Sequence, residues 1–105
     1  MKSHGPWAVI GVRGELDLHT STQLRDRLAE LIDEGRGRIA VDMREVAFMD
    51  SSSLGVLVVA MKRLREKGGE LGLVGVNGSP SKVLSLTGMD RVFPTYGTPS
   101  ELPGP

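Results

Sequence analysis

Residues 46–56 are Val-Ala-Phe-Met-Asp-Ser-Ser-Ser-Leu-Gly-Val, in which an apolar approach is followed directly by three serines. The pattern predicts a helix that begins at Asp50-Ser-Ser-Ser53 and runs to about Lys67, where Gly68-Gly69 ends it. The first amides of a helix lack partners and its dipole is positive there, so an anion or a phosphoryl group is favoured at this place. A simpler interpretation is that Asp50 or Ser51 only caps the helix and that the other serines tolerate its first turn.

Three short apolar runs predict strands on either side of this segment. They are Trp7–Val12, Arg38–Met43 and Leu71–Val76, all too brief for core helices. The third run is apolar on both faces. Strands of that kind belong inside a sheet that is covered by helices, and such sheets are usually parallel.

Two further helices lie between and after the strands. The earlier one is predicted to start at a capping box, Thr20-Ser-Thr-Gln23, and to end at Gly35. A short later helix is predicted with Ser79 as N-cap and Gly88 as its stop. The earlier helix carries one apolar stripe at helical spacing, formed by Leu24, Leu28, Leu31 and Ile32.

The order β-α-β-α-β-α predicts an α/β fold with a mostly parallel sheet of four to five strands and helices packed on it. We expect one domain over residues 1–96, with a short lead at 1–6 and a last short strand near Val92-Phe93. The proline-rich segment 97–105 is expected to form a loose tail.

The composition excludes several classes of function. Among the 105 residues, 13 Lys and Arg balance 13 Asp and Glu, so the chain lacks the basic field of a nucleic-acid binder. The absence of cysteine excludes disulfides and thiolate metal sites, and two histidines are too few for an imidazole cage. No stretch has the length of a membrane span or a signal peptide. We therefore expect a soluble cytoplasmic module without metal or cofactor.

Catalytic motifs are also missing from the sequence. There is no P-loop lysine and no GxSxG elbow, so neither a nucleotide hydrolase nor a serine hydrolase is indicated. His19 near Asp17 could form an acid–base pair, but a histidine in a loop before a helix is more often a solvated residue. The chain is not expected to be an enzyme.

One helix face has an unusual composition. At 100° per residue, Ser52, Val56, Val59 and Arg63 lie opposite the inner stripe that contains Leu54, Leu57 and Met61. A helix that merely covers a sheet would show charges there instead of two valines. Either a further layer buries this face, or it is a docking surface that begins at the serines.

Several motifs together resemble the anti-anti-sigma factors, which are the single-domain members of the STAS group. The likeness covers roughly residues 7–96, and the motifs keep the order and spacing of that family. They are Gly14-Glu-Leu-Asp17, Val41-Asp-Met43, Phe48-Met-Asp-Ser-Ser-Ser-Leu-Gly-Val56, Lys67-Gly-Gly-Glu-Leu71 and Leu86-Thr-Gly-Met-Asp90.

The resemblance implies a bacterial partner switch that regulates transcription. The unphosphorylated protein binds an anti-sigma factor that is also a serine kinase, and a sigma factor is released. Phosphorylation ends the binding, and a serine phosphatase restores it. The family's motif makes Ser51 the phosphate acceptor, Asp50 the motif aspartate and Ser52 the second hydroxyl position. The turn Glu15-Leu-Asp17 is expected beside the acceptor, where it joins Val56 and Val59 in the docking surface.

The sequence departs from the family pattern at two places. Ser53 stands where the family usually has glycine, so its side chain could hinder a kinase or act as a decoy acceptor. The N-terminus is short, and residues 1–6 can supply only a stub of the extra edge strand that family members commonly carry. Two other functions remain open: a STAS scaffold subunit of a stress-sensing assembly, and a small nucleotide-binding protein.

Overall fold

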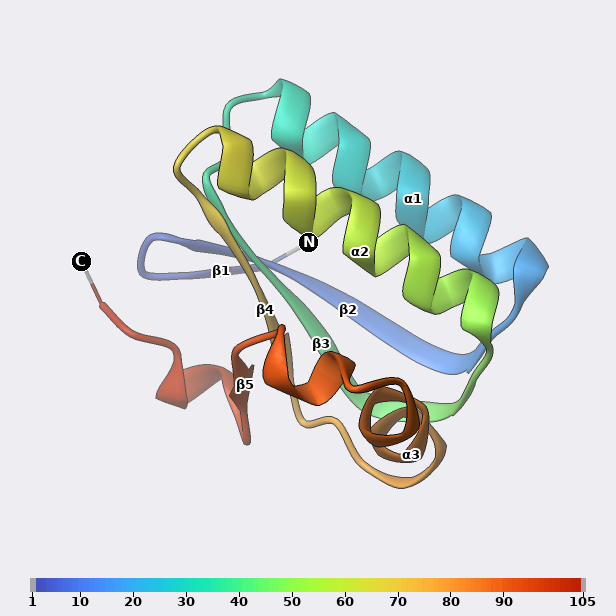
Figure 1. The fold of residues 1–105 in the computed structure, drawn as a ribbon. Coiled ribbons are helices and arrows are strands. Elements are labelled where there is room, and N and C mark those ends of the chain that lie inside the picture. The colour runs from blue at the N-terminus through green and yellow to red at the C-terminus, as the bar shows by residue number, and fades with distance from the viewer. Residues whose placement is uncertain (1, 105) are drawn as a thin grey trace.

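The computed structural model describes residues 2–104 and has a five-stranded sheet with helices on one face (Figure 1). The strands lie in the order β1-β2-β3-β4-β5, with β1 antiparallel to β2 and all the others parallel. This architecture confirms the predicted fold class. The strands are β1 (Lys2–His4), β2 (Trp7–Leu16), β3 (Arg38–Met49), β4 (Glu70–Val74) and β5 (Thr95–Tyr96). The helices are α1 (Leu18–Asp33), α2 (Ser51–Glu66) and α3 (Gly78–Thr87), with 3₁₀ turns η1 (Met89–Arg91) and η2 (Pro99–Glu101).

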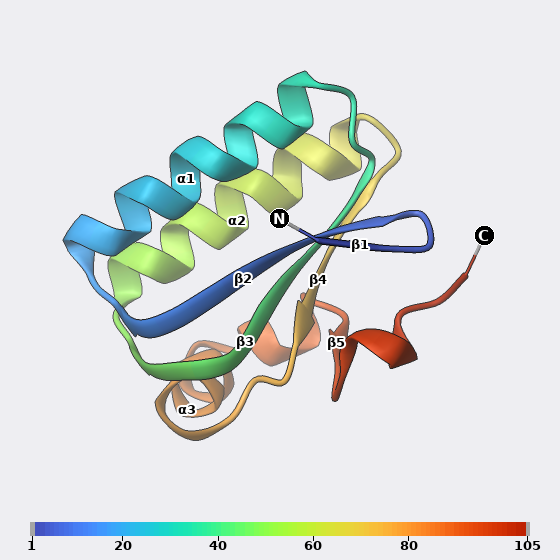
Figure 2. The same ribbon diagram turned by 180° about the vertical axis from the view of Figure 1, so that it is seen from behind.

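The main core lies between the sheet and the helices α1 and α2, which run side by side over the same face (Figures 1 and 2). Both helices pack there because each carries an apolar stripe at helical spacing. The stripe of α1 is the one predicted from the sequence, and the stripe of α2 includes Leu57 and Leu64. The sheet meets them with Ile39, Val41, Leu71 and Leu73, all almost fully buried. Each helix within residues 2–104 is too short or too polar to span a lipid bilayer.

The opposite face of the sheet carries a second, smaller apolar cluster, and the C-terminal segment covers it. Trp7 is completely buried there, beside Val9 and Ala40, and Leu102 packs against them. The Trp7 indole N–H also donates to the carbonyl of Pro103 at 2.9 Å. We call residues 97–104 the C-terminal strap. The described part of the expected loose tail is thus packed, because an apolar sheet face needs a cover and Leu102 supplies one.

The last strand also differs from its predicted position. Val92 and Phe93 follow η1 and are not in a strand, because Phe93 turns into the main core, where it is 3% exposed. The strand forms instead at Thr95–Tyr96, which pairs with Leu73–Val74. Apolar residues alone could not distinguish a core anchor from a strand at this point.

Two helices begin earlier than predicted. Asp17, not Thr20, is the N-cap of α1: its carboxylate accepts from the backbone N–H of Thr20 at 3.0 Å, and the Thr20 hydroxyl accepts from the Asp17 N–H at 2.9 Å. The capping box therefore spans residues 17–20 instead of 20–23. Helix α3 has Asn77 as its N-cap in place of Ser79. Its C-terminus agrees with the prediction, since Gly88 takes the left-handed conformation there.

The short N-terminal lead does form an edge strand. β1 pairs with only the beginning of β2, from Lys2 opposite Val9 to His4 opposite Trp7. The chain then turns at Gly5, whose φ of 57° suits glycine. Beyond Val9, no strand among the described residues lies on this side of β2. β1 is a strand of three residues.

Candidate functional site

The start of α2 and the turn before α1 lie at the same edge of the sheet. Both follow parallel neighbouring strands, whose carboxyl ends meet there: Glu15 is opposite Phe48 and Leu16 is opposite Met49. The backbone N–H of Asp50 donates to the carbonyl of Leu16 at 3.1 Å and joins the two turns directly. The structure therefore brings the Glu15–Asp17 turn next to the serine segment.

Asp50 organises the first turn of α2. It is the N-cap residue, and its Oδ1 accepts from the backbone N–H of Ser53 at 3.0 Å and from the Ser52 hydroxyl at 2.7 Å. The capping interpretation is thus satisfied by Asp50 and leaves Ser51 out. Capping alone gives no reason for a serine at position 51.

The three serines have different environments. Ser53 is completely buried, whereas Ser51 and Ser52 are exposed. Within residues 2–104 the Ser51 hydroxyl has no hydrogen-bond partner, while the Ser52 hydroxyl is held by Asp50. Ser51 therefore presents an accessible, uncommitted hydroxyl at the positive end of α2, where the helix dipole and the unpaired backbone amides favour added negative charge.

Ser53 links the start of α2 to the end of β2 by a hydrogen bond. Its hydroxyl donates to the carbonyl of Leu16 at 2.8 Å and lies 3.1 Å from Asp50 Oδ1. The sequence had left two roles for this side chain, as a hindrance to a kinase or as a decoy acceptor. A fully buried hydroxyl can do neither, because no protein can reach it.

Replacing Ser53 by alanine is expected to lower the free energy of unfolding by about 1 kcal/mol, since one buried hydrogen bond is lost. The Leu16 carbonyl keeps the Asp50 N–H as a donor, which limits the cost. Urea unfolding measures the change, with Ser52→Ala as the control on an exposed neighbour. A Ser53→Ala protein no less stable than Ser52→Ala would contradict a stabilising hydrogen bond between Ser53 and Leu16.

Both N-cap carboxylates are held in their charged form. Hydrogen bonds lower the pKa of Asp17, first of all the one from the Thr20 backbone N–H. The pKa of Asp50 is lowered as well, and the donated Ser52 hydroxyl is the largest cause. Asp17 and Asp50 also line one open hollow together with Leu18, His19 and Thr22. The edge therefore carries two fixed negative charges beside Ser51.

These pKa shifts predict a loss of stability in acid. A carboxylate with a lowered folded-state pKa stabilises the fold fully above its ordinary pKa of 3.8, and this contribution disappears as the pH falls through the lower folded value. The melting temperature of the wild type should thus fall more steeply below pH 3.8 than that of Asp17→Asn or Asp50→Asn. Thermal unfolding followed by circular dichroism at several pH values checks this. Parallel pH profiles for the three proteins would contradict it.

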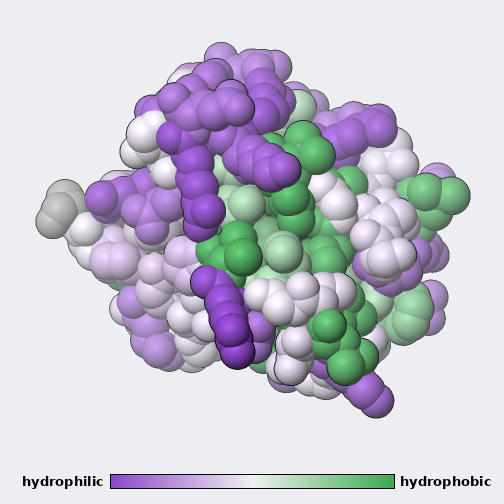
Figure 3. Space-filling model, in the orientation of Figure 1, coloured by the Kyte–Doolittle hydropathy of each residue, from purple (hydrophilic) through white to green (hydrophobic). Residues whose placement is uncertain are grey.

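Exposed apolar side chains lie at the serine edge, by which we mean residues 15–18 and 48–52, and further along α2. Leu18 is 72% exposed, Phe48 46% and Val59 58%, although all three are large and hydrophobic. Figure 3 shows hydrophobic surface gathered in the middle of the helical face, over α2 and beside α1. The sequence analysis missed Leu18 and Phe48. The alternation of Phe48 with the buried Met49 was a signal that could have found the second of them.

The unusual outer face of α2 is partly covered and partly free. Val56 is half-buried and lines a small hollow between α1 and α2, together with Leu28 and Ile32. Val59 lines the same hollow but stays largely exposed. No third layer covers this face within residues 2–104. A neighbouring helix, and not a further layer, therefore covers part of this face, and the docking surface stays a prediction.

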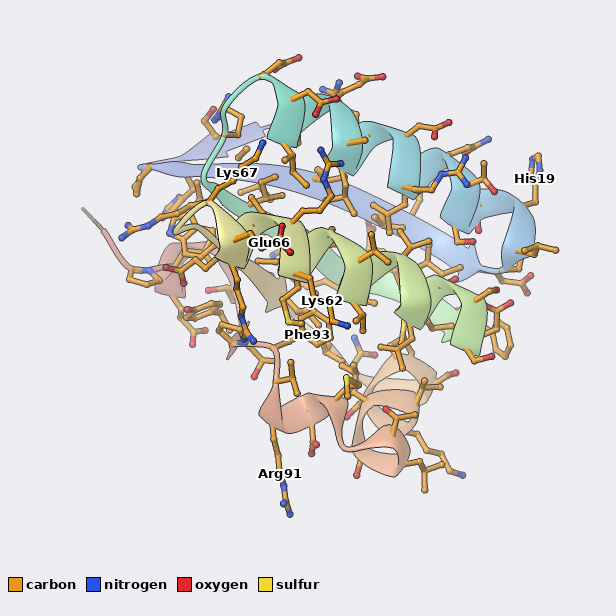
Figure 4. The ribbon with its side chains drawn as sticks, turned by 45° about the horizontal axis from the view of Figure 1, so that its top comes forward. His19, Lys62, Glu66, Lys67, Arg91 and Phe93 are labelled. Atoms are coloured by element: carbon orange, nitrogen blue, oxygen red, sulfur yellow. The ribbon has the colours of Figure 1, made fainter. Side chains whose placement is uncertain are left out.

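Other candidate groups have structural explanations. Asp17 is committed to capping α1, and His19 projects away from the body of the domain (Figure 4). In the basic end of α2, Arg65 donates to the carbonyl of Val92 at 2.8 Å and Arg63 pairs with Asp33. The described residues contain no group of three or more side chains suited to a metal ion.

The comparison with known families agrees with this geometry. A model of the STAS domain matches residues 1–102. The chain belongs to the STAS domain family. The match includes the C-terminal strap through Leu102, beyond residue 96, where the sequence analysis had placed the end of the domain.

Individual STAS proteins show the same likeness. An anti-sigma F factor antagonist of Paenibacillus polymyxa is 33% identical over 97 residues, which cover 91% of this chain and 83% of the relative. The crystal structure of a putative anti-sigma factor antagonist from Thermotoga maritima matches with a TM-score of 0.88 and 31% identity, over 95% of this chain and 86% of that one.

A third relative has been solved in two states. The unphosphorylated anti-sigma factor antagonist SpoIIAA matches with a TM-score of 0.82 and 27% identity, over 96% of this chain and 87% of that one. SpoIIAA of Bacillus in its phosphorylated form matches with a TM-score of 0.77 and 26% identity, over 96% and 91%. Both states of that relative therefore share the fold of this chain.

Proposed function

We propose that this STAS protein is an anti-sigma factor antagonist that acts by partner switching. Its unphosphorylated form binds an anti-sigma factor that is also a serine kinase, and a sigma factor is thereby released. The kinase phosphorylates Ser51 and so ends the binding, and a serine phosphatase restores it. The observation that carries this proposal is the exposed Ser51 hydroxyl at the N-terminus of α2, which has no hydrogen-bond partner among residues 2–104.

The surroundings of Ser51 are suited to a protein partner. Exposed Leu18 and Phe48 offer apolar area at the serine edge, and exposed Val59 adds more about two turns along α2. Glu15, Asp17, Asp50, Ser52 and Val56 add polar and half-buried contacts on the same side of the domain. Similar relatives named as anti-sigma factor antagonists support the class of partner.

The proposed switch is local and electrostatic. A phosphoryl group on Ser51 adds about −1.5 to −2 charges at pH 7. The positive end of α2 tolerates this charge, so the domain stays folded. A bound partner, however, would have to bury the phosphate close to the charged carboxylate of Asp50. Buried charge without a countercharge is strongly unfavourable, so the partner is released without any refolding.

The test starts from a complex of the cognate anti-sigma factor kinase with its sigma factor. Added unphosphorylated chain should release the sigma factor, which size-exclusion chromatography detects. Chain that has first been incubated with the kinase and ATP should release none, and mass spectrometry should locate one phosphate on Ser51. Failure to release the sigma factor would overturn the function, and a phosphate on Ser52 would overturn the assignment of the acceptor.

A further inference from the structure

The C-terminal strap covers the back of the sheet with few attachments. It leaves β5 and runs towards the turn that joins β1 and β2, on the face away from α1 and α2 (Figure 2). Within residues 2–104 it pairs with no strand. Two hydrogen bonds reach it from the sheet. The Trp7 indole N–H donates to the carbonyl of Pro103 at 2.9 Å. Arg38 Nη1 donates to the carbonyl of Gly104 at 3.2 Å.

The face under the strap is nevertheless completely closed. Trp7, Ala40 and Val74 are fully buried, and Leu102 of the strap packs with them. Among the described positions of the strap, Leu102 is the buried one. A segment that is held by one buried side chain and two hydrogen bonds opens at a lower free energy than the sheet below it, because buried contacts and hydrogen bonds determine local stability.

One carboxylate folds the first half of the strap into a tight turn. Glu101 Oε2 accepts from the backbone N–H of Thr98 at 3.0 Å and lies 3.3 Å from the Thr98 hydroxyl. The backbone N–H of Glu101 donates to the carbonyl of Thr98 at 3.1 Å, within η2. Pro99 stands at the first position of that turn, where its fixed φ is favourable. Leu102 follows the turn directly, so the turn determines where Leu102 meets the sheet.

Gly97 provides the space for this carboxylate. A Cβ at position 97 would lie 2.6 Å from Glu101 Oε2 and 3.4 Å from its Cδ, so the carboxylate would have to move away. The φ of Gly97 is not positive, and its backbone therefore does not require glycine. We call the contact of Glu101 with Gly97 and Thr98 the latch. A methyl group at position 97 would break the latch without straining the backbone.

We propose that the strap is a cover that opens as a unit while the rest of the sheet stays folded, and that the latch sets how often it opens. With the latch closed, the turn is preformed and Leu102 needs little further ordering to reach Trp7. With the latch broken, residues 97–101 have to be ordered each time the strap closes, which favours the open state. The open state exposes the face around Trp7 that the closed state hides.

Hydrogen exchange of the Trp7 indole N–H measures the opening directly, because this proton is buried and bonded to the strap. In the full wild-type chain, NMR should show that its protection is at least about a hundredfold lower than that of the Val41 amide in the centre of β3. Low concentrations of urea should accelerate the exchange of Val41 strongly and that of the indole little, since a local opening exposes little surface. Equal protection and equal urea dependence of the two protons would overturn the proposal.

A conservative core substitution tests whether the opening is local. Ile32→Val lies in α1, where Ile32 is 1% exposed, and destabilises the folded domain as a whole. It should raise the exchange rate of the Val41 amide about fivefold and leave that of the indole N–H unchanged, because the strap opens without disturbing α1. An indole rate that rises in parallel with that of Val41 would show that only global unfolding exposes Trp7.

Two strap variants test the latch. Glu101→Ala should raise the exchange rate of the indole N–H about fivefold, since a hydrogen bond is lost. Gly97→Ala should raise it about threefold, because alanine also restricts the open strap and so offsets part of the effect. Added to Glu101→Ala, however, Gly97→Ala should raise the rate no further, since no carboxylate is left to displace. Gly104→Ala is the matched control: a Cβ there meets no atom within 4 Å, and the rate should not rise.

Two results with these variants would overturn the latch. One is an unchanged indole rate in Gly97→Ala, and the other is a further rise when Gly97→Ala is added to Glu101→Ala. Ser51→Asp should leave the indole rate at the wild-type value, because Ser51 follows the far end of β3. The opening of the strap is thus tested independently of the partner switch.

Discussion

A Ser51→Asp variant is expected to bind the anti-sigma factor kinase about a thousandfold more weakly than the wild type, which corresponds to about 4 kcal/mol. The substituted carboxylate would have to be buried in the interface beside Asp50, whose own charge is stabilised by hydrogen bonds from the Ser52 hydroxyl and the Ser53 backbone N–H. Pull-down of the purified kinase, followed by titration calorimetry, measures the loss. Equal capture of the variant and the wild type would defeat the charge-switch account.

Two controls separate charge from other effects of the substitution. Ser51→Ala keeps a small neutral side chain, cannot be phosphorylated and should bind constitutively, even after incubation with kinase and ATP. Ser85→Asp places the same charge on an exposed residue of α3 and should bind like the wild type. The fold should survive in Ser51→Asp, because a carboxylate at position 51 is favourable near the N-terminus of α2, and in the two other variants, because both change exposed residues.

A Trp7→Ala variant is expected to lose about 3–5 kcal/mol of its free energy of unfolding. Trp7 is fully buried, its ring lies 6.1 Å from that of Tyr96, and its indole N–H holds the C-terminal strap at Pro103. Because domains of this kind have about 5–15 kcal/mol in total, the variant should be close to unfolding at room temperature. Urea unfolding followed by circular dichroism measures the change.

Leu86→Ala is the matched control for this truncation. Leu86 is 78% exposed on α3, so its removal should change the stability by no more than about 0.5 kcal/mol. A Trp7→Ala protein as stable as Leu86→Ala would show that the strap does not close the second apolar cluster.

Much of the fold could be predicted because its strands and helices have different hydrophobic periods. The apolar stripe of α1 and the two-faced strand at Leu71 are examples. Helix starts were harder, since Asp17-Leu-His-Thr20 and Thr20-Ser-Thr-Gln23 both fit a capping box and only tertiary structure chooses between them. The strap was missed because Leu102, the buried apolar residue among its described positions, lies between prolines and polar residues in the sequence.

The candidate site was predicted in position but not in detail. Its segment was recognisable from three serines at a helix start, yet the sequence alone did not separate their roles. Helical spacing offered one unused signal: Ser53 lies four and eleven residues before Leu57 and Leu64, which places it on the inner stripe. The apolar Leu18 could not be placed from the sequence, because its exposure depends on where α1 begins, whereas the exposure of Phe48 could have been predicted from its alternation with the buried Met49.

The complete burial of the Trp7 indole determines what the intrinsic fluorescence of this protein can report. Trp7 is its single tryptophan and stands at the start of β2, whereas Ser51 follows the far end of β3. The ten residues of β2 place Trp7 roughly 30 Å from the end of the sheet at which Ser51 lies. Intrinsic fluorescence will therefore monitor detachment of the strap and global unfolding, and complex formation at the serine edge will be spectroscopically silent. A dye for binding studies has to be attached near the start of α2.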